Sequence, residues 1–212
     1  DRLPGCSHRK NRRSLHTGAF RKAAGAGIPG HAGKNCRCHT GNDVGADMRA
    51  DIVSSGEARI SKTVLARISP GEDVFSALRE VCRKHDIRSG HIATMIGSLR
   101  SADVICVTSH PEDPSRAVYL DPLHLEGYLE LVGVQGIIGE DDRGDLSIHL
   151  HVVIAESDMK PTAGHLADTG NNRILATAEA VINSFSGAEF KRSFDEETGF
   201  VLFKVREGSR EK

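Results

Sequence analysis

The chain has 212 residues and a formal net charge of −1, which suits one large domain or a smaller domain with a tail. No run of about eighteen apolar residues occurs, so the sequence excludes a transmembrane helix, and we expect no secretory signal. The five cysteines do not form the pattern of a disulfide framework and favour a reducing compartment. We therefore expect a cytoplasmic protein that does not bind membranes.

The nearly neutral charge hides two segments of opposite sign. Residues 1–47 hold nine Lys and Arg against three Asp, a net charge of +6, and residues 48–212 carry −7. The first segment also has few large apolar side chains, so it cannot offset the entropy of ordering, and we expect a disordered basic tail. Because Met48 is the first methionine, we interpret this tail as upstream or non-native sequence. A transit peptide and a basic arm for nucleic acid over 8–13 are the alternatives.

The first elements of the domain are predicted to be a strand over 63–68, where apolar and polar residues alternate, and a helix over about 71–85. Ser69 fits an N-cap, Pro70 has the φ angle of a first helical turn, and Glu72 completes a capping box. Apolar residues then follow at helical spacing, so we expect the helix to bury one face.

The remaining elements are expected to be strands, which lie over 91–97, 102–108, 117–120, 127–139, 147–155, 173–185 and 200–206. The residues 141–144, Asp-Asp-Arg-Gly, are typical of a hairpin turn. One helix followed by many strands predicts an α+β fold, a mainly antiparallel sheet with one N-terminal helix packed on it. The linker, the domain and the C-terminal tail that we expect cover 48–61, 62–206 and 207–212.

Two histidines lie in the alternating apolar strand predicted over 147–155. The period of two places His149 and His151 on one face, about 7 Å apart along the strand. The polar residues 156–162 have the right length to turn the chain, which lets His165 return beside the first pair. Three neutral imidazoles with a fourth position for water form a catalytic or ligand-binding zinc site, so we predict Zn²⁺ or another divalent metal here. The alternative is that these histidines are ordinary surface, core or interface residues.

Two carboxylates lie inside otherwise apolar strands. Glu130 occurs in the segment 127–133, and Glu179 occurs in the segment 176–182. A lone acid in such a strand must be paired, act as a ligand or face solvent. We consider both as candidate catalytic groups, either as a general base or as support for a ligating histidine. A salt bridge or a solvent-facing position is the alternative for each.

The sequence lacks the motifs that are typical of several functional classes. The sequence has no G-x-x-x-x-G-K-[ST], G-x-G-x-x-G or G-x-S-x-G pattern, so it offers no recognisable nucleotide-phosphate loop and no serine nucleophile elbow. The few aromatic residues do not alternate with basic ones, which argues against a stacking surface for single-stranded nucleic acid.

The segments of the domain occur in an order that resembles the PPC domain (plants and prokaryotes conserved), known in plants as the partner of AT-hook motifs. The match spans about 62–206. Its segments are 71–74 (Gly-Glu-Asp-Val), 96–99 (Ile-Gly-Ser-Leu), 127–136 (Gly-Tyr-Leu-Glu-Leu-Val-Gly-Val-Gln-Gly), 149–152 (His-Leu-His-Val), 164–166 (Gly-His-Leu), Glu179 and 195–200. Ala163 stands where the family pattern has a second glycine, and the sequence has no R-G-R-P hook.

The resemblance implies an α+β fold, a homotrimer, and clustered histidines that can hold a metal near a subunit boundary, but it implies no established reaction. Our first hypothesis is a trimeric domain whose three-histidine metal site binds or turns over a small molecule. If it is an enzyme, the reaction would be metal-assisted hydrolysis or proton transfer. Our second hypothesis is a DNA-associated regulatory module. Because residues 48–212 carry a charge of −7, nucleic acid would bind only through the basic tail or a partner.

Overall fold

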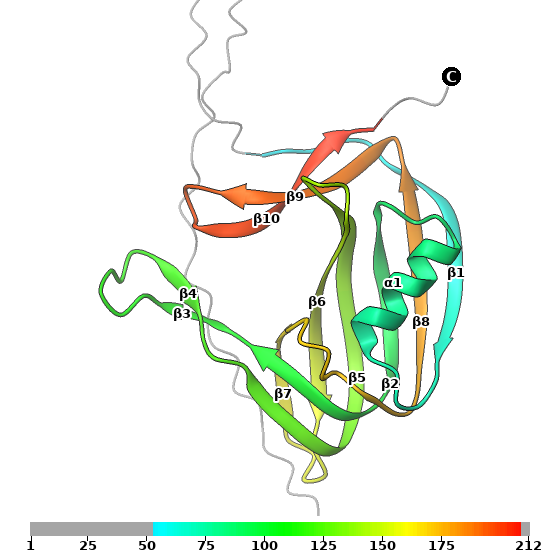
Figure 1. Cartoon of the computed structure of the whole chain (residues 1–212), viewed down its shortest axis with the longest axis vertical. Helices are drawn as coiled ribbons and strands as arrows, with labels where there is room; N and C mark the ends of the chain where they lie inside the picture. The colour runs from blue at the N-terminus through cyan, green and yellow to red at the C-terminus, as the bar shows by residue number, and fades with distance from the viewer. Residues whose placement is uncertain (1–52, 209–212) are drawn as a thin grey trace, which may run out of the picture. The chain divides into compact units, whose positions relative to one another are not determined.

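The computed structural model describes residues 53–208, so the expected basic tail lies outside the described residues (Figure 1). In chain order the elements are β1 (Arg59–Ile68), α1 (Val74–Lys84), β2 (Gly90–Ile105), β3 (Val107–Ser109), β4 (Ala117–Tyr119), β5 (Leu123–Asp141), β6 (Leu146–Ala155), β7 (Pro161–Leu166), β8 (Ile174–Ser186), β9 (Ala188–Asp195) and β10 (Phe200–Glu207). Within these residues no helix has both the length and the apolar character needed to cross a membrane.

Eight strands form one sheet in the order β1-β8-β2-β7-β6-β5-β9-β10, and β3 and β4 form a separate hairpin. The strand pairs of the described chain are antiparallel, except for a short parallel contact of β5 with β9. Because β2 also pairs with β5, the pairs β2–β5, β5–β6, β6–β7 and β7–β2 close a circuit of four strands. The mainly antiparallel α+β fold agrees with the sequence prediction.

The hydrophobic core lies between α1 and the inner face of the sheet. The helix contributes Val74, Phe75, Leu78 and Cys82, which are all buried. The strands contribute fully buried side chains that include Met95, Leu99, Leu131, Leu150, Ile154 and Leu166. Burying each large apolar side chain stabilises the fold by about 1.5–3 kcal/mol, so this core holds β2, β5, β6 and β7 together beneath the outer face of the sheet.

The start of α1 differs from the prediction. Asp73 is the N-cap, and its Oδ1 accepts a hydrogen bond from the backbone N–H of Ser76 at 2.9 Å. Ser69 and Glu72 instead belong to a turn, in which Gly71 has a φ of +82°, a left-handed conformation that an α-helix does not contain. The N–H of this glycine bonds to the carbonyl of the first residue of β8 at 2.9 Å. The predicted capping box was therefore wrong, because the turn is tied to the sheet.

The structure joins two predicted strands and adds two others. The strands expected over 91–97 and 102–108 lie mostly in the single long strand β2. Gly97 lies within it, and a Cβ at this position would meet the carbonyl oxygen of Thr177 at 2.2 Å, so the glycine permits a bulge close to β8 and does not end the strand. The strands β7 and β9 were not predicted, because their apolar alternation is short or interrupted by polar residues. The predicted turn over 141–144 joins β5 to β6, as expected.

Candidate metal centre

Strand β6 has one buried face and one accessible face. Its even-numbered residues from Ile148 to Ile154 are buried in the core. The period of two turns His149 and His151 to the opposite, outer face of the sheet. The strand therefore presents two imidazoles side by side, as the sequence predicts.

Strand β7 supplies the third histidine. The chain reverses after β6, where the N–H of Glu156 donates to the carbonyl of Lys160 at 3.2 Å. The strand then pairs antiparallel with β6, and the Cα atom of His165 stands opposite that of His151. Residues directly opposite each other in such a pair point to the same face. The predicted return of His165 to the first pair is thus confirmed.

Gly164 lets β7 reach this position. A Cβ at this residue would meet the carbonyl oxygen of Ile105 and Cγ1 of Val104, each at 2.8 Å. Ile105 is also the residue of β2 that pairs with His165. Any larger side chain would therefore push β7 away from β2 and displace the third imidazole.

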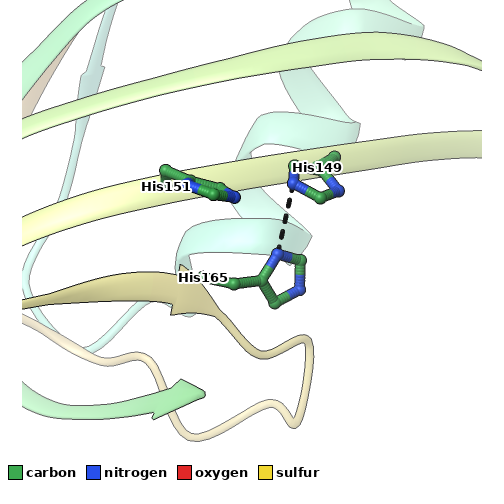
Figure 2. A group of neighbouring side chains, drawn as sticks. All are labelled: His149, His151 and His165. Atoms are coloured by element: carbon green, nitrogen blue, oxygen red, sulfur yellow. Dashed lines mark hydrogen bonds between the residues drawn. The ribbon is translucent and has the colours of Figure 1, made fainter. Parts of the chain in front are cut away.

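The three imidazoles point toward one another (Figure 2). One nitrogen from each ring lies within 4.8 Å of the others. The rings of His149 and His151 are stacked with centroids 5.0 Å apart, and the His165 ring meets them edge-on at 4.5 and 5.8 Å. Nδ1 of His165 lies 3.4 Å from Nε2 of His149. Two ligands of a tetrahedral ion with bonds of about 2.1 Å are separated by about 3.4 Å, so the His149–His165 pair has the spacing of two Zn²⁺ ligands, and His151 lies within 4.8 Å of both.

Burial keeps two of the rings neutral. The pKa of His149 is lowered from 6.5 to about 4, mainly by burial and to a smaller extent by the charges of His165, Arg192 and His151. Burial likewise lowers the pKa of His165 from 6.5 to about 4, with contributions from His151 and Arg192. A neutral imidazole has a free lone pair for a cation, whereas a protonated one has none. Both rings are therefore in the ligating form at pH 7.

The metal-free protein is expected to lose stability as the pH falls from 6.5 toward 4. In this window the unfolded chain protonates His149 and His165, whereas the folded chain holds their pKa values at about 4. The unfolded state then binds up to two more protons, so its free energy falls relative to the folded state as the pH is lowered. Urea unfolding at several pH values between about 4 and 7 measures this slope. Between about pH 5 and 6.5, above the range in which carboxylates such as Asp103 and Glu140 titrate, the double variant His149→Asn, His165→Asn should lose most of the slope, and an unchanged slope there would contradict this origin.

An open hollow borders the cluster on the outer face of the sheet. It has a volume of about 570 Å³, and its lining includes His91, Gln135, His149 and His151. His91 on β2 pairs with Ile137 on β5, which in turn pairs with His149 on β6, so these residues form one row across three strands. The place of His91 beside the cluster could not be predicted from the sequence, because nothing in its linear spacing connects β2 with β6.

Two hairpins meet beside His165. The ring of Tyr119 on β4 lies 5.8 Å from the His165 ring and 5.1 Å from the ring of Phe200 on β10. Figure 1 shows the β3–β4 and β9–β10 hairpins projecting toward the same side of the molecule. Their contact encloses one side of the cluster, whereas His151 is exposed. A small molecule can therefore approach the imidazoles from the side of His151.

The two glutamates lie elsewhere on the sheet. The Cα atom of Glu130 stands opposite that of Ala155, four residues or about 13 Å along β6 from His151. Glu179 lies on β8, three strands from β6, and accepts a hydrogen bond from Oγ1 of Thr177 at 2.8 Å. Both glutamates are exposed, and neither belongs to the histidine cluster. Their assignment as catalytic groups stays a prediction.

The fold and the cluster define a β-rich domain with a candidate three-histidine metal centre on its outer face. The model of the Plants and Prokaryotes Conserved (PCC) domain family matches residues 55–186. The chain belongs to this family, which is the one that its sequence resembles.

Solved structures share this fold. A metal-containing protein from Archaeoglobus fulgidus has a TM-score of 0.58 and 25% identity, over 71% of this chain and 99% of that one. A plant- and prokaryote-conserved (PPC) protein from Pyrococcus horikoshii has a TM-score of 0.60 and 22% identity, over 71% of this chain and 96% of that one. A protein from Bacteroides thetaiotaomicron described as a candidate DNA-binding protein has a TM-score of 0.56 and 20% identity, over 72% of this chain and 97% of that one.

One curated relative matches in sequence. It is the bifunctional protein GlmU of Synechococcus sp. (strain JA-2-3B'a(2-13)), which is 27% identical over 140 residues. The match covers 66% of this chain but only 20% of the relative, so the chain spans about a fifth of that protein.

Proposed function

We propose that the chain binds Zn²⁺ or another divalent cation through His149, His151 and His165, and that this centre binds or turns over a small molecule. The observation that carries the proposal is the convergence of three imidazole nitrogens within 4.8 Å. Structural zinc sites fill all four positions with protein ligands, whereas three ligands leave one position for water or substrate. The similarity to a metal-containing protein of Archaeoglobus fulgidus also supports it.

The chemistry follows from the donor set. When bound, such an ion lowers the pKa of a coordinated water toward about 7 and can polarise a carbonyl group. Metal-assisted hydrolysis and proton transfer are therefore the reaction classes that we propose, if the chain is an enzyme. The chain itself contributes three imidazoles held on two paired strands, with His151 on the accessible side. The paired strands therefore hold the three histidines in a preorganised arrangement before a metal ion binds.

Metal analysis of the purified full chain tests this proposal. After incubation with Zn²⁺ and desalting, the wild type should retain one ion per chain. The variant His151→Ala should bind at least about tenfold more weakly, because one of three ligands is lost. His91→Ala, Glu130→Gln and Glu179→Gln are matched controls that lie outside the cluster, and all three should retain the ion. Equal metal content in the wild type and His151→Ala would overturn the proposal.

We also propose a homotrimer, as the family resemblance implies. Tyr128, Val132 and Val153 expose 79%, 54% and 40% of their surface on β5 and β6. Val132 and Val153 also line a hollow of about 440 Å³ together with His151. Val132 and Val153 are thus exposed apolar residues next to the candidate site, and Tyr128 lies further along β5. Such residues are typical of an interaction surface. A second copy on this surface would lie beside His151, so the candidate centre would stand near a subunit boundary.

A DNA-associated role is the second candidate function, because two structural neighbours are described as candidate DNA-binding proteins. Residues 48–212 carry a net charge of −7, whereas contacts to phosphates need Lys and Arg. Under this alternative, DNA would be held by the basic segment 1–47, which lies outside the described residues, or by a partner protein.

A further inference from the structure

An arginine from a distant strand lies beside the histidine cluster. Nη1 of Arg192 on β9 donates a hydrogen bond to Oγ of Ser147 on β6 at 3.1 Å. Ser147 precedes His149 by two residues, so both side chains lie on the same face, about 7 Å apart along the strand. The guanidinium carbon of Arg192 also lies 5.4 Å from the centre of the Phe203 ring, which helps to hold the side chain in place.

No carboxylate of the described chain pairs with this guanidinium. Within residues 53–208, no Asp or Glu oxygen lies within 4.0 Å of Arg192. Asp141, its neighbour in register on β5, accepts hydrogen bonds from the backbone of its own turn. Asp168 is paired with Arg79. The positive charge of Arg192 is therefore not neutralised by a direct partner, although its residue is half-buried.

Most of the donors of this side chain are also free. A guanidinium has five N–H groups, and among the described residues only two are used, by Oγ of Ser147 and, at 3.4 Å, by the carbonyl of Val201. The remaining N–H groups form the planar fork that binds the two oxygens of a carboxylate or phosphate. Arg192 is therefore a cation held in place with unused hydrogen-bond donors beside the three histidines, as expected of a group that binds an anionic ligand.

We propose that the centre takes an anionic small molecule, and that Arg192 binds the carboxylate or phosphate group of this ligand beside the metal. The inference rests on the proposed metal site. Three neutral imidazoles leave the full charge of a divalent ion uncompensated, and Arg192 adds a further positive charge nearby. Opposite charges attract strongly in a partly buried site, so an oxyanion is the ligand that this combination favours over a neutral or cationic one.

Tyr119 lies at the edge of the same space. Its ring packs near His165, as described above, and 44% of its surface is exposed. Tyr119 on the β3–β4 hairpin and Arg192 on the β9–β10 hairpin therefore both lie beside the histidines of β6 and β7. The ligand would therefore enter on the open side beside His151 and lie along the sheet toward the two hairpins, with its anionic group toward β9.

Anion titration of the cobalt-loaded full chain tests this inference. Bound Co²⁺ has a visible absorption spectrum that changes when its ligands change, so acetate and methyl phosphate can be titrated separately. At least one of the two anions should change the spectrum of the wild type. The anion that does so shows whether the site prefers a carboxylate or a phosphate. Arg192→Gln should weaken the binding of that anion by about tenfold or more, because it removes charge-assisted hydrogen bonds. The variant Arg192→Lys should bind the anion with an affinity between those of the wild type and Arg192→Gln, because lysine keeps the positive charge but lacks the paired N–H donors of the guanidinium.

The control is Arg67→Gln, an exposed arginine on β1 that bonds to Thr177 and should behave as wild type. Cobalt content is measured for every variant, so that a loss of metal is not mistaken for a loss of anion binding. If Co²⁺ binds but neither anion changes the spectrum, or Arg192→Gln and the wild type bind the anion equally, the anion proposal is overturned while the metal site stands. If the wild type takes up no Co²⁺, the metal site is overturned and the anion proposal falls with it.

Discussion

Zn²⁺ at about a hundredfold excess over its dissociation constant is expected to raise the free energy of unfolding of the full chain by about 2.7 kcal/mol. The reason is that only the folded state brings His165 of β7 beside His149 and His151 of β6. For a domain of this size, the gain corresponds to a rise in the unfolding temperature of about 5–10 °C. Differential scanning calorimetry with and without ZnCl₂, at neutral pH and fixed protein concentration, measures it.

The control for this prediction is the double variant His149→Ala, His165→Ala, which leaves one imidazole of the cluster. Its unfolding temperature should not respond to Zn²⁺, whatever its stability without metal. The comparison is made within each protein, with and without the ion, so a general loss of stability in the variant does not affect it. A rise of the same size in the double variant would mean that Zn²⁺ acts elsewhere on the chain.

The candidate site could be predicted from the sequence because it depends on short-range geometry. Alternation along β6 places His149 and His151 on one face whatever the rest of the fold does. The return of His165 needed only a turn of suitable length between two neighbouring strands. The mainly antiparallel fold was likewise visible in the order of one helix and many apolar strands.

The surroundings of the site could not be predicted, because they depend on the pairing of distant strands. Arg192 lies on β9, a strand that its own sequence does not indicate, and it reaches Ser147 only because β9 pairs with the end of β5. Tyr119 reaches His165 through a hairpin that leaves the main sheet. The N-cap of α1 was predicted at Ser69 but lies at Asp73, because a contact of the preceding turn with β8 decides where the helix begins. Each of these features is set by tertiary contacts, which a single sequence does not contain.

A buried polar network holds the far end of β7, and Asn172 lies at its centre with no exposed surface. Its Nδ2 donates to the carbonyl of Ala167 at 2.7 Å, and its Oδ1 accepts from the backbone N–H of Asp103 at 3.0 Å. Its own backbone N–H donates to Oδ2 of Asp73, the N-cap of α1, at 3.3 Å. One side chain therefore links β2 and the residue that follows β7, and its backbone joins both to the start of the helix.

Replacing this residue, Asn172→Ala, is expected to lower the free energy of unfolding by about 2 kcal/mol or more. The substitution removes the side-chain partner of the buried N–H of Asp103, at a cost of about 1–3 kcal/mol, and one of the two hydrogen bonds to the carbonyl of Ala167, which still accepts from the N–H of Thr169 at 3.0 Å. Urea unfolding measures the loss. The matched control is Asn171→Ala, because Asn171 is exposed and, within residues 53–208, its side chain makes a single hydrogen bond, to Oδ2 of Asp103 at 3.1 Å. That variant should lose about 1 kcal/mol.

The same substitution should also weaken metal binding, although Asn172 does not touch the cluster. Ala167 follows the last residue of β7, and its N–H donates to the carbonyl of Asp103 at 2.8 Å, two residues beyond His165. If the C-terminal end of β7 is held less firmly, the imidazole of His165 can move relative to β6. Metal affinity is sensitive to such small displacements of a ligand. Zinc titration at a temperature where the variant is folded should therefore give a weaker affinity than in Asn171→Ala. Equal affinities in the two variants would show that the β6–β7 pairing alone positions His165.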